Sequence, residues 1–225
     1  MKIRFYIFIF YHFCGLLQLF GQPEAYFKHY GTENGLPQHT VTDILQDEKG
    51  FMWFSTWDGL SKFDGYTFTT YHLPSGNTVE SRSSRIDNLY EDKYNNIWAL
   101  TYDNQAYRFN IETASFLGPN SIEACRENAF SVSQIVPKES GVVWLLSEKH
   151  GCISITDSLF STNVYSTRNH NLTDDCVHAI YEDKSQNSWI LTNNGLTLVP
   201  AGTSASVFYF HPLSAARYTE AVPFF

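Results

Sequence analysis

The spacing of tryptophans is the feature of this 225-residue chain that most restricts its fold. Four of the five tryptophans recur at intervals of 45, 46 and 45 residues: Trp53, Trp98, Trp144 and Trp189. An aliphatic residue stands nine positions before each one: Ile44, Leu89, Ile135 and Ile180. A hydroxyl residue stands three positions after: Thr56, Thr101, Ser147 and Thr192. A period of this length indicates repeated copies of one supersecondary unit.

Each repeat has the pattern of an antiparallel meander. The strands predicted in the first repeat are 41–46, 51–56, 60–63 and 66–71. Turn residues separate them, as in Asp58-Gly59. The second strand of each repeat is apolar on both faces, so we expect another sheet on each side of it. The sequence therefore predicts an all-β fold, a β-propeller with four recognisable four-stranded blades of about 45 residues each.

The recurring residues have structural interpretations. We expect the four repeated tryptophans to be core wedges between blades. An aspartate stands six residues before three of them and is expected to cap backbone N–H groups of a turn: Asp47, Asp92 and Asp183. The third repeat has Lys138 at this position. The recurring Thr and Ser residues are expected to form hydrogen bonds within their blade.

The domain boundaries follow from the repeats. The propeller is predicted over 22–211, in units of about 36–80, 81–126, 127–171 and 172–211, with an irregular tail over 212–225. Four blades are few, and the last unit has its own outer strand at 206–211. We therefore predict an incomplete propeller, either a truncated or split chain with further blades elsewhere, or one that self-associates.

The first 21 residues have the pattern of a secretory signal peptide. Lys2 and Arg4 precede an apolar run over 5–20, and Gly21 offers a small residue for cleavage. The run is shorter than the ~20 residues of a spanning helix, and an uncleaved membrane anchor is the alternative. We expect the mature chain to be exported to the periplasm.

Charge and cysteine content exclude some classes of function. The formal charge is −8, which disfavours binding to phosphate backbones, so no nucleic-acid partner is predicted. Cys125, Cys152 and Cys176 show no paired spacing, and we interpret them as buried apolar residues, with one disulfide and a leftover thiol as the alternative. No cofactor and no metal site are predicted.

Several stretches resemble a known repeat family. They are 35–41, 59–65, 89–98, 172–177 and 180–189, and they are similar to the two-component regulator propeller repeat. The third repeat departs from the pattern at 137–140. The resemblance implies the periplasmic sensor part of a hybrid two-component regulator, which responds to oligosaccharides released from glycans. No kinase, receiver or DNA-binding pattern follows in this sequence, so no kinase activity is predicted, and membrane association would come only through further downstream segments.

The candidate ligand-binding residues lie on loops that join the second and third strands of the blades. They are Trp57, Asp58, Tyr102, Asp103, Asn104, His150, Asn193 and Asn194. Aromatic rings beside Asp and Asn suit a sugar, because the rings stack on C–H faces while the polar groups bind hydroxyls. Trp57 is the foremost candidate because it stands outside the repeated series. The alternative is that these are ordinary turn residues.

Two other functions compete with a sensor. A propeller lyase or glycosidase could use Asp58, Asp103 and Glu148, which come from successive blades. No common hydrolase, metalloprotease or phosphate-binding motif is present, and His150 with Cys152 lacks the second pair that a metal site needs. The other competitor is a passive scaffold or a nonfunctional remnant of a longer gene.

Overall fold

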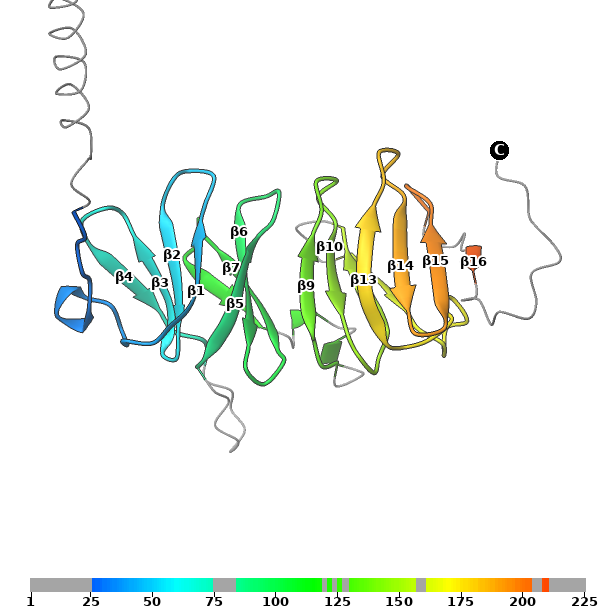
Figure 1. Ribbon diagram of the computed structural model, residues 1–225, viewed down its shortest axis with the longest axis horizontal. Helices are drawn as coiled ribbons and strands as arrows, with labels where there is room; N and C mark the ends of the chain where they lie inside the picture. The colour runs from blue at the N-terminus through cyan, green and yellow to red at the C-terminus, as the bar shows by residue number, and fades with distance from the viewer. Residues whose placement is uncertain are drawn as a thin grey trace, which may run out of the picture. The chain divides into compact units, whose positions relative to one another are not determined.

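The protein folds into four antiparallel sheets of four strands each. The computed structural model describes residues 26–74, 84–118, 121–122, 125–126, 130–156, 161–203 and 208–210. The sheets lie in the unit that begins at Gly31, and residues 26–30, which belong to a separate N-terminal unit, contain no helix or strand. The predicted all-β fold is confirmed (Figure 1).

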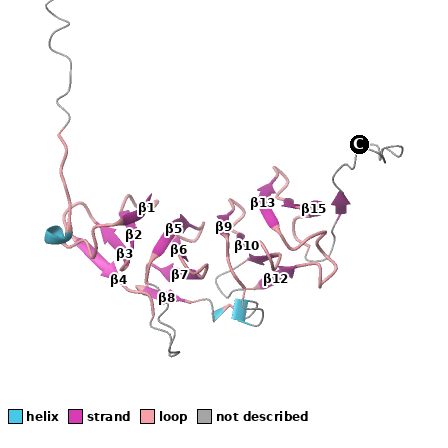
Figure 2. Ribbon diagram, turned by 60° about the horizontal axis from the view of Figure 1, so that its bottom comes forward, coloured by secondary structure: helices cyan, strands magenta, loops and turns pink. Residues whose placement is uncertain are grey.

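Each sheet contains four consecutive strands (Figures 1 and 2). Sheet 1 follows the 3-10 helix η2 (Thr32–Asn34) and contains β1 (Val41–Gln46), β2 (Met52–Thr56), β3 (Gly59–Phe63) and β4 (Phe68–Tyr71). Sheet 2 contains β5 (Ile86–Glu91), β6 (Asn96–Thr101), β7 (Ala106–Asn110) and β8 (Ser115–Leu117). Sheet 3 contains β9 (Gln134–Pro137), β10 (Val143–Leu146), β11 (Cys152–Ile155) and β12 (Thr162–Tyr165). Sheet 4 contains β13 (Val177–Glu182), β14 (Ser188–Thr192), β15 (Gly195–Val199) and β16 (Phe208–Phe210).

The first three strands agree with those predicted for the first repeat to within one residue, and the fourth begins later than predicted. The predicted strand 66–71 begins two residues later, at Phe68. The reason is the Asp64 carboxylate, whose Oδ1 accepts hydrogen bonds from the backbone N–H groups of Tyr66 at 2.8 Å and Thr67 at 2.7 Å. These bonds extend the turn and delay the strand.

Neighbouring sheets pack face to face through the repeated tryptophans. Trp53, Trp98 and Trp144 are each at most 2% exposed. Each belongs to a core cluster that includes an aliphatic residue of the following sheet: Leu89, Ile135 and Ile180, respectively. The repeated tryptophan of one sheet therefore packs against the repeated aliphatic residue of the next sheet, as expected for wedges between propeller blades.

In the first and last sheets, one of these packing residues lacks a covering sheet. Ile44, the aliphatic residue of sheet 1, is 54% exposed, whereas its three counterparts are buried. Trp189 of sheet 4 is partly exposed, whereas the three earlier tryptophans are buried. The covering of one sheet by the next thus stops at sheets 1 and 4, and the four sheets form an incomplete propeller.

The turn aspartates have a second role besides capping. Asp47 Oδ1 accepts the backbone N–H of Phe51 at 2.9 Å, which confirms the cap, and Oδ2 accepts the indole N–H of Trp53 at 2.8 Å. The same indole–carboxylate bond joins Trp98 to Asp92 at 2.8 Å and Trp189 to Asp183 at 3.1 Å. Each sheet except sheet 3 therefore links its first turn to its core tryptophan.

Several predicted features lie partly or wholly outside the described residues. The signal peptide over 1–21 and the tail over 212–225 are among them, and of the outer strand at 206–211 the structure describes β16. Within the described part of the chain, no helix is long and apolar enough to cross a membrane. The three later cysteines have free thiols; Cys125 and Cys152 are buried, as predicted, and Cys176 is partly exposed.

Candidate functional site

Hydrogen bonds of the recurring Thr and Ser residues shape the loops that carry the candidate residues. The hydroxyls of Thr56, Thr101 and Thr192 each donate to a backbone carbonyl across the turn at 3.1 Å. In sheet 3, Ser147 Oγ accepts the backbone N–H groups of Lys149 and His150, both at 3.2 Å. The predicted bonds within each blade are confirmed, and they fix the turns at one end of each sheet.

A β-bulge places a polar residue beside these turns in three sheets. The pairing of the first two strands skips one residue, which is Thr42 in sheet 1, Asp87 in sheet 2 and His178 in sheet 4. Ser133 occupies the same repeat position in sheet 3 and donates its backbone N–H to the Leu146 carbonyl at 2.8 Å. Bulges re-aim side chains and are frequent near binding sites.

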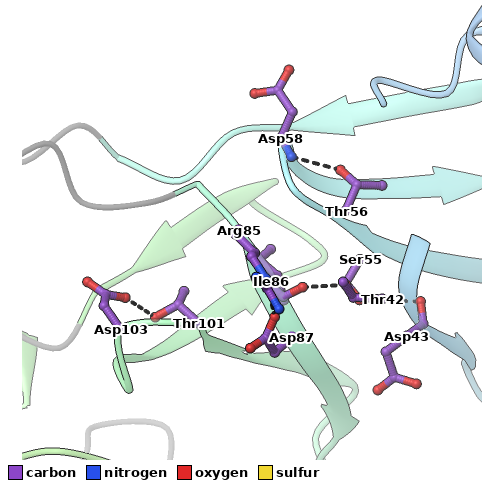
Figure 3. Close-up of polar contacts among 10 residues, drawn as sticks. All are labelled: Thr42, Asp43, Ser55, Thr56, Asp58, Arg85, Ile86, Asp87, Thr101 and Asp103. Atoms are coloured by element: carbon purple, nitrogen blue, oxygen red, sulfur yellow. Dashed lines mark hydrogen bonds and ion pairs between the residues drawn. The ribbon is translucent and has the colours of Figure 1, made fainter. Parts of the chain in front are cut away.

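Arg85 brings two of the predicted aromatic residues together. Its guanidinium carbon lies 5.2 Å from the centre of the Trp57 ring and 4.5 Å from that of Tyr102, distances typical of cation–π contacts. The Arg85 Nε also lies 2.7 Å from the Asp87 carboxylate (Figure 3). Trp57 is 49% exposed and Tyr102 is 62% exposed, so both rings remain accessible. We call Trp57, Arg85, Asp87 and Tyr102 the aromatic–arginine cluster.

The acidic residues beside this cluster, Asp58 and Asp103, each contact a threonine hydroxyl at their own turn (Figure 3). The Asp58 backbone N–H donates to the Thr56 hydroxyl at 3.1 Å, and its carboxylate lies 3.7 Å from the His72 ring. Asp103 Oδ1 lies 2.5 Å from the Thr101 hydroxyl oxygen. Both carboxylates are exposed.

The other predicted residues have local partners. Asn104 adopts a left-handed φ of 60°, and its carbonyl accepts the Val132 N–H at 2.8 Å, which ties its turn to the segment before sheet 3. His150 Nδ1 lies 3.3 Å from the Ser147 hydroxyl, and the His150 ring lies 5.8 Å from the Phe130 ring. These contacts give Asn104 and His150 roles in shaping the loops.

A second polar group forms at the turn of sheet 4. Asn193 Oδ1 lies 2.6 Å from His178 Nε2, and Asn194 Nδ2 donates to the Asp174 carboxylate at 2.7 Å. Sequence reasoning selected the two asparagines but missed His178 and Asp174. His178 could have been found from its repeat position, eleven residues before the tryptophan, where all four repeats carry a polar residue.

The arrangement suits binding through flat rings and fixed hydrogen-bonding groups. The rings of Trp57 and Tyr102 offer stacking surfaces, and Arg85 and Asp87 offer a donor and an acceptor beside them. Within the described residues, no group of three or more His, Cys, Asp or Glu side chains is placed to hold a metal ion.

The fold and the repeated tryptophan-centred sheets define an incomplete β-propeller. Part of its first repeat is similar to the two-component regulator propeller repeat. A family model described as "Two component regulator propeller" matches residues 35–58. Histidine kinase P4 of Formosa agariphila is 51% identical over 45 residues, which are 20% of this chain and 3% of that protein.

Solved structures share the fold. The extracellular domain of a hybrid two-component system of B. thetaiotaomicron, BT3049, matches 81% of this chain with a TM-score of 0.57 and 25% identity. This chain covers 26% of that one. Virginiamycin B lyase from Staphylococcus aureus matches 81% of this chain and 59% of its own, with a TM-score of 0.50 and 14% identity, a likeness of fold alone. The chain thus spans a small part of the two-component relatives it matches.

Proposed function

We propose that this chain is the ligand-recognising part of an extracytoplasmic two-component sensor and has no kinase activity of its own. The likeness to the extracellular domain of a hybrid two-component system supports this role. So does the family match at residues 35–58. Export to the periplasm by the peptide over 1–21 belongs to the same proposal.

The ligand that we propose is an oligosaccharide derived from a glycan, and the observation that carries this choice is the aromatic–arginine cluster. Two accessible rings on successive sheets lie against one guanidinium, so their relative positions are fixed before a ligand arrives. Preorganised aromatic surfaces lower the entropic cost of binding. Asp58, Asp103 and the pair Asn193 and Asn194 supply further hydroxyl-binding groups on loops of the same kind.

The partly exposed face of sheet 4 supports a further proposal about assembly. Tyr181 and Leu191 are exposed on this sheet, and Trp189 is partly exposed. In sheets 1 to 3 the tryptophan is covered by the following sheet. We propose that another propeller blade covers Trp189, and self-association of this chain is the competing arrangement.

Glycan-array screening of the full chain, followed by calorimetric titration of each hit, tests the binding proposal. Trp57→Ala and Tyr102→Ala should each weaken binding at least tenfold, which corresponds to about 1.4 kcal/mol. Tyr66→Ala is the matched control, because Tyr66 is 89% exposed on the β3–β4 turn, away from the β2–β3 turns. Absence of any glycan hit, or unchanged affinity in both cluster variants, would contradict the proposal.

The same glycans distinguish a sensor from a propeller enzyme. A sensor returns its ligand unchanged, so chromatography after prolonged incubation should show the intact oligosaccharide. Appearance of shorter or unsaturated products would favour lyase or glycosidase chemistry. In that case Asp58, Asp103 and Glu148 are the carboxylates to substitute first.

A further inference from the structure

A cavity of about 530 Å³ lies between sheets 3 and 4, lined by residues of both sheets. This size falls within the range of small-molecule pockets, roughly 300–1,000 Å³. Its buried lining includes Trp144, Ser154, Tyr165 and Ser188, and its exposed lining includes Gln186 and Thr203. It is distinct from the aromatic–arginine cluster, which lies on sheets 1 and 2 and the segment between them.

The cavity exists partly because sheet 4 presents smaller residues than sheet 2 does. Ile97 pairs with Phe109 in sheet 2, and both are buried against the Trp53 cluster. The Phe109 ring lies 5.5 Å from the Trp53 ring. At the same register, sheet 4 has the pair Ser188 and Val199. The lost volume leaves space beside Trp144.

A shorter side chain on sheet 3 enlarges this space further. The residue that pairs with the core tryptophan on the third strand is Lys62 in sheet 1 and Arg108 in sheet 2. Lys62 Nζ lies 5.6 Å from the Trp53 ring centre and 3.6 Å from the Phe51 ring centre. Sheet 3 has Ser154 at this position. A long cationic side chain is thus replaced by a hydroxyl.

The Trp144 side chain, which lines the cavity, has a buried donor that lacks an acceptor among the described residues. Trp144 Nε1 is buried and has no hydrogen-bond partner among the described residues, whereas the indoles of the other three sheets donate to a turn aspartate. Lys138 replaces that aspartate, and its Nζ donates to the Ile180 carbonyl at 2.7 Å. An unsatisfied buried donor costs about 1–3 kcal/mol, so an acceptor supplied by a ligand would recover part of this cost.

The buried lining is uncharged and combines hydroxyl groups with the Trp144 indole and Val199. Burial raises the pKa of the Tyr165 phenol, which hydrogen-bonds with the Ser154 side chain and therefore stays neutral near pH 7. The Glu182 carboxylate accepts hydrogen bonds from the backbone N–H and the hydroxyl of Ser140. The rest of the lining combines hydroxyls and amides with the Trp144 indole and with apolar residues such as Val142 and Val199, a combination that accommodates hydroxyl groups and one apolar face of a ligand.

We propose that the cavity between sheets 3 and 4 binds a neutral polyhydroxylated molecule of monosaccharide size. In the bound state a hydroxyl oxygen of the ligand accepts the Trp144 indole N–H, and hydroxyls bind Ser154 and Ser188. This second site is independent of the oligosaccharide site proposed above.

The test is calorimetric titration of the full chain with glucose, galactose, arabinose and the anionic control glucuronate. A neutral sugar should bind saturably and glucuronate at least tenfold more weakly, because burial disfavours an unpaired carboxylate. Ser154→Arg introduces the side chain of sheet 2 and should abolish binding by filling the cavity. Trp144→Phe keeps a ring but removes the donor, and should weaken binding at least fivefold.

The controls separate this proposal from the first one. Trp57→Ala should leave monosaccharide binding unchanged, and Ser154→Arg should leave oligosaccharide binding unchanged. Circular dichroism and a thermal melt establish that each variant is folded. Saturable sugar binding that survives in folded Ser154→Arg, or no binding of any of the three neutral sugars, would overturn the proposal whatever the outcome for oligosaccharides.

Discussion

The bond between Asp47 and Trp53 gives the sharpest prediction about stability. Asp47 is buried, and its carboxylate accepts both the turn N–H of Phe51 and the indole N–H of Trp53, which is fully buried. A hydrogen bond to a charged group contributes about 1.5–3 kcal/mol. Because Phe51 is only half-buried, water can replace the carboxylate as the acceptor of its N–H. Water cannot do so for the buried indole N–H. Asp47→Ala should therefore lower the free energy of unfolding by about 2–4 kcal/mol.

A double-mutant cycle isolates the indole term. Trp53→Phe keeps an aromatic ring in the interface between sheets 1 and 2 but has no N–H to leave unsatisfied. In that background Asp47→Ala should cost only the turn cap, so the coupling energy should be about 1–2 kcal/mol. Urea denaturation followed by far-ultraviolet circular dichroism gives the four free energies of unfolding. A coupling energy below about 0.3 kcal/mol would refute the reasoning, because independent sites add within that margin.

Sheet 3 supplies an internal comparison for the same argument. Trp144 has no acceptor for its indole N–H among the described residues, so Trp144→Phe loses ring volume without losing a hydrogen bond. Trp53→Phe loses both. Trp144→Phe should consequently be the milder variant by about 1 kcal/mol or more. An equal cost for the two variants would show that ring volume alone determines the contribution of these tryptophans.

Two further predictions concern acid and thiol chemistry. Side-chain hydrogen bonds from Asn187 and Trp189 hold the pKa of Asp183 at about 2, so its ionised form stabilises the fold above pH 3.8 and this contribution is lost as the pH falls to about 2. Asp183→Asn should remove that part of the acid sensitivity in urea titrations between these pH values, and an unchanged pH profile would contradict it. Burial raises the pKa of Cys152 far above its usual value, so maleimide at pH 7.5 should label partly exposed Cys176 and spare Cys152 in peptide mass mapping of the native protein. Comparable labelling of both thiols would show that the core opens readily.

The repeat pattern was sufficient to predict the fold because it encodes packing directly. The tryptophan and aliphatic columns lie on facing surfaces of neighbouring sheets, so their period equals one sheet. The exposure of Ile44 and Trp189 agrees with the predicted incomplete propeller, but the sequence did not identify which residues would be exposed. The exposure of each residue depends on whether another sheet packs against it. The repeat pattern is the same in every sheet, so it does not say which sheet lacks a neighbour.

The site was less predictable for a related reason. Trp57 could be selected because it breaks the series. Its cation–π partner Arg85 could not, because it lies just before the first strand of the second repeat, with no turn or strand signal of its own. The β-bulges that present Asp87 and His178 arise from strand register, which a hydrophobic pattern leaves open at a polar position. Positions that recur were easier to place than the contacts made between repeats.

Departures from the repeat are the positions at which this chain can acquire a specific role. A residue that follows the pattern is explained by blade packing, whereas Lys138 replaces the indole acceptor that the other three sheets have, and Ser154 and Ser188 are smaller than their counterparts in sheet 2. All three lie at one interface, and so does the cavity of about 530 Å³ lined by Trp144, whose indole N–H has no hydrogen-bond partner in the described part of the chain. Three independent losses at a single interface are costly to stability unless something compensates. A bound ligand would compensate through mass action, and it would make the stability of the sheet 3–sheet 4 interface respond to the concentration of that ligand.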